Sequence, residues 1–285
     1  MRTVSVVGIG SGNPEHVTVQ AIGELNAADV VFMLDKGDDR ESLTDVRSQI
    51  CERYISGGCR IVTAADAQRD RDAAEYASAV EDWRARRADI YERLLTTELA
   101  ENGRGVVLAW GDPALYDSTL HVLAEVRARG TVSFDLRVVP GISSVQALAA
   151  QHQVSLTRTG RPLHITTGRR LAAEGFPAHS DDVVVMLDAR NAFSLAADDD
   201  EIYWGAYVGT PDEILIAGRV ADVGPRIVAE RAAARERHGW IMDTYLLRRT
   251  SGPAQDADQA GQPGEAGGVG EAEGVGRAER AGGAG

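Results

Sequence analysis

Short apolar runs alternate with longer amphipathic stretches over residues 1–158 of the chain. Such an alternation is typical of a mostly parallel sheet covered by helices. The sequence therefore predicts an N-terminal α/β domain over this range. The predicted strands lie at 3–10, 30–35, 60–64, 105–110 and 134–140, and the predicted helices at 18–29, 70–100, 115–130 and 143–152.

The pattern changes near residue 162, after which strand-like runs follow one another with fewer helices between them. These runs lie at 162–168, 181–189, 201–210, 213–223 and 239–249. We interpret residues 159–250 as a second, smaller α/β domain with a mixed sheet.

Residues 251–285 consist mainly of glycine, alanine and acidic residues. Such a segment cannot bury enough apolar surface to offset the loss of chain entropy on folding. We therefore predict a disordered C-terminal tail.

The formal net charge is -13, and Lys36 is the only lysine among the 30 basic residues. A strongly acidic chain is a poor nonspecific ligand for nucleic acid or for an anionic membrane. An anionic ligand would therefore need a local cluster of arginines. We expect no nucleic-acid or membrane partner.

No apolar stretch approaches the roughly 18 residues that a membrane helix needs, and the first residues show a strand pattern rather than that of a signal peptide. Cys51 and Cys59 lack the spacing of a metal site, so we expect reduced thiols, no bound metal and a cytoplasmic protein.

A glycine-rich loop, GIGSGNP, directly follows the first predicted strand at residues 8–14. Glycines at this place let backbone N–H groups approach a ligand closely. With Asp35 at the end of the second strand, the loop suggests a dinucleotide-binding fold. However, the spacing is G-x-G-x-G, and the next helix begins more than one turn after the last glycine.

Two further small-residue turns follow predicted parallel strands, Gly-Asp-Pro at 111–113 and Pro-Gly-Ile-Ser-Ser at 140–144. Open α/β sheets bind ligands beyond the carboxyl ends of their strands. The three turns therefore predict one binding site at this edge of the sheet.

Three motifs in this order, GIGSGNPEHVT, GDPALYDST and PGISSVQALA, resemble the tetrapyrrole methylases, two-domain enzymes that use S-adenosylmethionine. The resemblance covers nearly all of residues 3–249. Within the family, the chain is most similar to the member that methylates C-1 of precorrin-5 and releases its acetyl group as acetate. The segments that carry this similarity are LDKGDDRESLTDVR, HITTGRR and GWIMDTYLLRR. The resemblance thus implies a methyltransferase of cobalamin biosynthesis with a small tetrapyrrole as substrate, and it leaves open a homodimer with a second copy of the chain.

The resemblance also implies which residues contact S-adenosylmethionine, between the two domains. They are Ser11, Trp110, Gly111, Asp112, Leu115, Ser143 and Ser144 in the three loops, with Met186 and Gly209 from the second domain. Asp112 could equally stabilise its own turn, and Met186 could belong to the core.

The expected chemistry suggests further candidates. Methyl transfer needs alignment of the reacting atoms, whereas loss of an acetyl group needs a base for water and a donor to the carbonyl. We assign these roles to Asp35 and Tyr116. Lys36, Arg169 and Arg170 are candidates for binding the carboxylates of the tetrapyrrole.

Other functions remain open at this point. They are methylation of a different tetrapyrrole, a nicotinamide-dependent oxidoreductase, a methylase of RNA or protein, and a regulator that binds the cofactor without catalysis. The acidic charge disfavours RNA, since the chain has no basic stripe.

Overall fold

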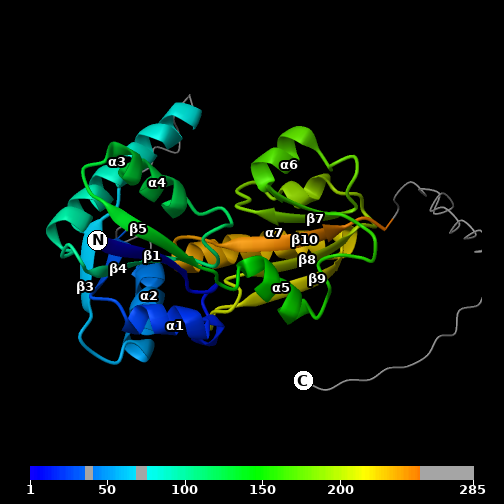
Figure 1. Ribbon diagram of the computed structural model, residues 1–285. Helices are drawn as coiled ribbons and strands as arrows, with labels where there is room; N and C mark the ends of the chain where they lie inside the picture. The colour runs from blue at the N-terminus through cyan, green and yellow to red at the C-terminus, as the bar shows by residue number, and fades with distance from the viewer. Residues whose placement is uncertain (36–40, 69–75, 251–285) are drawn as a thin grey trace, which may run out of the picture. The chain divides into compact units, whose positions relative to one another are not determined.

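The computed structural model describes residues 1–35, 41–68 and 76–250 (Figure 1). Residues 1–251 form one compact unit. It contains two five-stranded sheets, sheet A before residue 140 and sheet C after residue 162. The predicted α/β fold is confirmed, while the division into two domains at residue 158 stays a prediction.

Sheet A has the strand order β3-β2-β4-β1-β5, and all its neighbouring strands are parallel. Its strands are β1 Arg2–Gly8, β2 Val30–Asp35, β3 Arg60–Ala65, β4 Arg104–Ala109 and β5 Phe134–Val139. β4 pairs with both β1 and β2, so it separates the first two strands.

Alternating side chains of the strands bury the two faces of sheet A. Val4 and Val6 of β1 share a core with α3 and α4, whereas Val7 shares a core with α1 and α2. Figure 1 shows the two helix pairs on opposite sides of the sheet. These helices are α1 Val19–Asn26, α2 Glu41–Tyr54, α3 Tyr76–Thr97 and α4 Thr119–Arg129.

Sheet C is mixed, as predicted. Its order is β6-β7-β10-β8-β9, with β6 and β7 parallel and the other neighbours antiparallel. Its strands are β6 Leu163–Thr167, β7 Asp182–Met186, β8 Glu201–Ala206, β9 Ile214–Arg219 and β10 Asp243–Arg248. One face packs against α6 Gly168–Glu174, the 3-10 helix Ala192–Leu195 and α7 Val220–His238.

The other face of sheet C packs against α5 Ser144–His152, the helix that follows the last strand of sheet A. Val145 of α5 lies in one core with Val184 of β7 and Leu246 of β10. This helix therefore carries the third sequence motif into the core of the second sheet.

Three helices of the described chain were missed from the sequence, α2, α6 and α7. The strand-like run 213–223 was extended too far, because β9 ends at Arg219 and α7 begins at Val220. The helix predicted at 115–130 begins only at Thr119.

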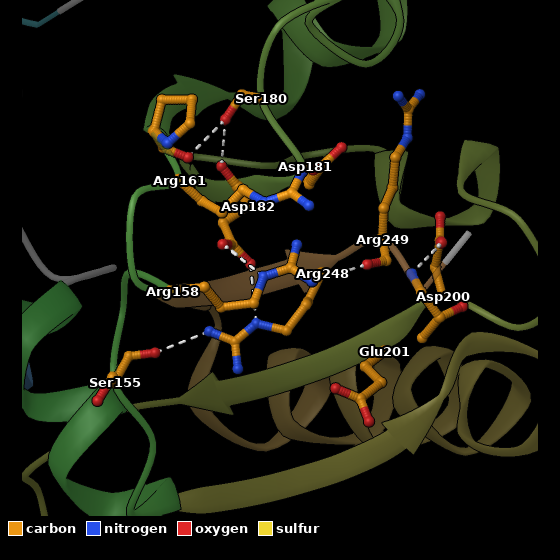
Figure 2. A network of polar contacts seen from close by, with 12 residues as sticks. Ser155, Arg158, Arg161, Ser180, Asp181, Asp182, Asp200, Glu201, Arg248 and Arg249 are labelled. Atoms are coloured by element: carbon orange, nitrogen blue, oxygen red, sulfur yellow. Dashed lines mark hydrogen bonds and ion pairs between the residues drawn. The ribbon is translucent and has the colours of Figure 1, made fainter. Parts of the chain in front are cut away.

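Ion pairs with a buried carboxylate connect the segment between the two sheets with the last strand of sheet C (Figure 2). Asp182 has no exposed side-chain surface, and its two carboxylate oxygens lie 3.0 Å from Nε of Arg158 and 2.8 Å from Nε of Arg248. Arg248 also donates to the carbonyl of Ser155 at 2.7 Å. One carboxylate thus joins the segment before β6 to the last strand.

Cys51 and Cys59 are free thiols. In the described part of the chain, helices of sufficient length and apolarity to cross a membrane are absent.

Candidate functional site

The first two glycine loops join through their backbones beyond the carboxyl ends of β1 and β4. Gly10 donates to the carbonyl of Gly111 at 3.3 Å, and Gly111 donates back to the carbonyl of Gly10 at 2.8 Å. Both residues have positive φ, 82° and 67°, which glycine adopts without steric cost. The two motifs therefore form a single surface.

The third loop approaches this surface just as closely. A Cβ at Gly8 would lie 2.6 Å from the backbone nitrogen of Gly141, and a Cβ at Gly141 would overlap the carbonyl oxygen of Gly111. Only residues without a side chain fit at these two positions.

Asp112 connects the second and third loops through its side chain. Its carboxylate accepts hydrogen bonds from the N–H groups of Ala114 at 2.8 Å and Gly141 at 2.9 Å. These contacts agree with the interpretation of Asp112 as a turn-stabilising residue. A contact between Asp112 and the cofactor stays a prediction.

Ser143 and Ser144 lie at the start of α5. Ser143 is the N-cap residue, and its hydroxyl accepts from the N–H of Val145 at 3.1 Å and contacts the side chain of Gln146. Ser143 is buried, whereas Ser144 is half-buried. The capping bond explains serine at position 143 without a ligand.

A loop of sheet C reaches the first glycine loop. A Cβ at Gly209 would lie 3.1 Å from Oγ of Ser11, and a Cβ at Gly12 would overlap the side chain of Thr210. Among the described residues, the buried Oγ of Ser11 has no hydrogen-bond partner. A buried hydroxyl without a partner is costly, so Ser11 fits a position that completes its hydrogen bonding with a bound molecule.

Three predicted cofactor residues contribute apolar surface. Leu115 and Met186 pack against the same small core as Val145, and Trp110 packs against the α1–α2 side of sheet A. All three are partly buried. Their positions suit the walls of a site, while their contact with a ligand stays a prediction.

Tyr116 lies in the loop after β4 with an unusual positive φ of 53°, and 47% of the residue surface is exposed. Its hydroxyl donates to the carbonyl of Ile165 in β6 at 3.4 Å. Burial raises the pKa of the phenol, against the smaller opposite effect of Arg170. The hydroxyl is therefore protonated at neutral pH and can donate a hydrogen bond.

The predicted substrate-binding cations lie in different surroundings. Arg170 lies near Tyr116 but already forms an exposed ion pair with Glu174 at 3.0 Å. Its neighbour Arg169 is exposed at the start of α6. Lys36 lies outside the described residues.

Asp35 ends β2 at the same edge of the sheet, and its backbone carbonyl accepts from the N–H of Asp66 at 2.7 Å. In a dinucleotide-binding fold the first two strands are neighbours. Here β4 lies between them, so Asp35 does not follow the strand next to the glycine loop. The strand order disfavours the dinucleotide interpretation.

A cluster of polar side chains around Arg47 and Arg87, beyond the ends of β2 and β3, was not predicted from the sequence. The only local signal was the i, i+4 spacing of Trp83, Arg87 and Tyr91 on one face of a helix. The guanidinium of Arg87 lies over both aromatic rings.

Comparisons with known proteins agree with this geometry. The family model of the tetrapyrrole (corrin/porphyrin) methylases matches residues 3–224. A precorrin-6A synthase [deacetylating] from Sinorhizobium sp is 53% identical over 251 residues, which cover 87% of this chain and 96% of that protein.

Solved structures share the fold. A cobalamin synthesis related protein (CobF) from Corynebacterium diphtheriae has 35% identity and a TM-score of 0.76, over 88% of this chain and 100% of that one. A uroporphyrin-III C-methyltransferase from Thermus thermophilus, in complex with S-adenosyl homocysteine, has 19% identity and a TM-score of 0.53, over 87% and 97%. On its sequence, its two sheets and its joined glycine loops, the chain belongs to the tetrapyrrole methylase family.

Proposed function

We propose that the chain transfers a methyl group from S-adenosylmethionine to C-1 of precorrin-5 and releases the acetyl group as acetate, giving precorrin-6A. The observation that carries the proposal is the 53% identity that extends over 96% of the precorrin-6A synthase from Sinorhizobium sp. We further propose a cytoplasmic enzyme that acts as a homodimer.

The joined loops suit S-adenosylmethionine, which presents a carboxylate, an ammonium group and a ribose to its binding site. The loops bring the backbone together at Gly10, Gly111 and Gly141 without side chains between, which lets a ligand approach closely, and Ser11 adds a buried hydroxyl without a partner among the described residues. When bound, S-adenosylmethionine supplies an electrophilic methyl group on a positively charged sulfur. The contribution of the chain is orientation, because the displacement is in line and needs little acid or base.

Release of the acetyl group requires more from the side chains. Water adds to the acetyl carbonyl, the bond between that carbon and C-1 breaks, and its electron pair passes into the macrocycle. Asp35 would accept the proton of the water, and Tyr116 would donate a hydrogen bond to the carbonyl oxygen. The raised pKa of Tyr116 keeps that proton available.

Product stoichiometry tests the overall reaction. The purified chain, incubated with precorrin-5 and S-adenosylmethionine, should form acetate and S-adenosylhomocysteine in equal amounts. Uroporphyrinogen III should not be methylated at a comparable rate. Methylation without acetate would indicate a different tetrapyrrole C-methyltransferase, and tight binding of NAD(P) without methyl transfer would favour an oxidoreductase.

The role of Asp35 is tested by Asp35→Asn, which keeps the shape of the side chain and removes its basicity. Acetate release should slow by about 100-fold, a typical loss for a general base, while the affinity for S-adenosylhomocysteine should not change. Normal turnover of the variant would place the base elsewhere.

A further inference from the structure

A polar cluster lies beyond the carboxyl ends of β2, β3 and β4, separate from the glycine loops. Its members come from two helices and two loops. They are Arg47 on α2, Asp66 after β3, Arg87 and Tyr91 on α3, and Asp117 and Ser118 before α4.

Arg87 has an anionic partner within this cluster. Its Nε lies 2.9 Å from Oδ1 of Asp66, and NH1 donates to Oγ of Ser118 at 2.9 Å. Both side chains of the ion pair are almost completely buried. Arg87 and Asp66 therefore balance each other's charge.

Arg47 is in a different situation. Its NH1 donates to the backbone carbonyl of Leu34 at 3.4 Å, which is long for a hydrogen bond. Its Nε is buried, and among the described residues no hydrogen-bond acceptor or ion-pair partner lies within reach of it. Burial lowers the pKa of this guanidinium, and the charge of Arg87 acts in the same direction.

The charges of Asp66 and Asp117 oppose the effect of burial on the pKa of Arg47, but among the described residues neither carboxylate forms an ion pair with it. Asp66 pairs with Arg87, and Asp117 accepts a hydrogen bond from the N–H of Thr119 at 2.6 Å. A buried guanidinium that lacks its own anion is destabilising. Among the described residues, the donors of Arg47 thus have no carboxylate in an ion pair with them.

We propose that Arg47 binds a carboxylate side chain of the tetrapyrrole substrate. The proposal rests on the proposed function, because the macrocycle supplies the carboxylate. Arg47 reaches the carbonyl of Leu34, one residue before Asp35, so the anion would be held beside the assigned base. A guanidinium binds a carboxylate through two parallel hydrogen bonds, and this fixes the orientation of the macrocycle.

S-adenosylmethionine also has a carboxylate, so the test must separate the two sources. In Arg47→Met, KM for precorrin-5 should rise about 10- to 100-fold, the loss expected for hydrogen bonds to a charged group. The affinity for S-adenosylhomocysteine, measured by calorimetry, should stay unchanged. Arg47→Lys keeps the charge without the fork and should give an intermediate KM.

Thermal unfolding without ligands provides a measurement that does not depend on turnover. Removal of an unpaired buried cation should leave the melting temperature of Arg47→Met equal to that of the wild type, or raise it. Arg93→Gln is the matched control, since Arg93 is an exposed arginine of α3. It should alter neither KM nor melting temperature.

Three results would overturn the proposal. A lower melting temperature with unchanged KM would make Arg47 a structural residue. Weaker binding of S-adenosylhomocysteine with unchanged KM would assign the carboxylate to the cofactor. A chain that neither turns over precorrin-5 nor binds uroporphyrin III, measured by quenching of tryptophan fluorescence, would refute both proposals.

The two proposals can also fail separately. A wild-type chain that binds uroporphyrin III but does not convert precorrin-5 would refute only the proposed function. In that case the affinity of Arg47→Met for uroporphyrin III decides the inference. A weaker affinity supports it, and an equal affinity overturns it.

Discussion

The two sheets hold their connecting segments by different means. At the carboxyl edge of sheet A, backbone groups of Gly10, Gly111 and Gly141 approach one another without side chains between them. Sheet C instead buries carboxylates with charged or hydroxyl partners, such as Asp182 with Arg248 and Asp188 with Tyr245. The first arrangement depends on the absence of side chains, whereas the second depends on pairing between side chains.

This difference predicts separable effects of substitution. At the glycine loops an added side chain removes space and should affect ligand binding first. In sheet C the loss of one charge leaves its partner buried and should affect stability first.

The largest effect on stability is expected for Asp182→Ala. Arg158 and Arg248 would lose their shared carboxylate, and breaking a buried pair costs about 3–5 kcal/mol. Urea unfolding would measure the loss. Asp181→Ala is the matched control, because Asp181 pairs with the more exposed Arg161 and should cost about 0–1 kcal/mol. Equal losses in both variants would show that burial of the Asp182 carboxylate adds nothing to the stability of sheet C.

Gly111→Val tests the glycine loops at the carboxyl edge of sheet A. We expect affinity for S-adenosylhomocysteine to fall by about 100-fold or more, about 2.7 kcal/mol, because the branched side chain would press against Ser143 at the joined loops. The positive φ adds about 1–2 kcal/mol of backbone strain.

Gly130→Val separates the effect of backbone strain from the effect of filling the cofactor site. Gly130 has a similar φ of 74°, yet nothing lies within 4 Å of a Cβ built there. This variant should lose stability to the same strain and retain its affinity for S-adenosylhomocysteine. If both variants bind it equally, the joined loops do not form the cofactor site.

The same contrast explains how much the sequence predicted. The parallel sheet and its three ligand loops follow from local signals, since apolar runs mark the strands and glycines mark the turns after them. α2 was missed because its exposed side is rich in charge, with only a narrow buried stripe that includes Ile50 and Cys51. The start of α7 continues the apolar run of β9, so periodicity did not separate strand from helix.

Side-chain pairing across the fold could not be predicted in this way. Arg47 and Arg87 lie on different helices, and Asp66 follows a third element. Nothing in the local sequence indicates that Arg87 pairs with Asp66 while Arg47, among the described residues, donates to the carbonyl of Leu34. The hydroxyl of Tyr116 likewise reaches the carbonyl of Ile165, which lies 49 positions further along the chain.

A smaller effect is expected from His152, which links α5 to sheet C. One ring nitrogen, Nε2, donates to the carbonyl of Trp204 at 3.0 Å, and burial lowers the pKa of the ring. A lowered pKa means that the folded state favours the neutral ring. The contribution of His152 to the free energy of unfolding is therefore fully present above the ordinary pKa of about 6.5. It is lost as the pH falls through the lowered pKa of the folded state.

Substitution of His152 by glutamine keeps a donor and removes the titration. The drop in melting temperature between neutral and mildly acidic buffer should be smaller in His152→Gln than in the wild type. His164→Gln is the control at an exposed position and should retain the wild-type pH dependence. An unchanged pH dependence in His152→Gln would show that other groups cause the acid sensitivity.

The smallest effect is expected from removal of the C-terminal segment, which tests where the charged network of sheet C ends. Truncation after Thr250 keeps the bonds of Thr250 to Asp199 and Asp200 and the ion pair of Arg248. Because the deleted residues have almost no apolar side chains, melting temperature and turnover should equal those of the full chain. Truncation after Leu247 removes Arg248 from Asp182 and should lower the melting temperature clearly. If the chain truncated after Thr250 already loses stability or activity, the segment after Thr250 contributes contacts to the folded enzyme. The stabilising contacts of sheet C would then extend beyond its buried carboxylates.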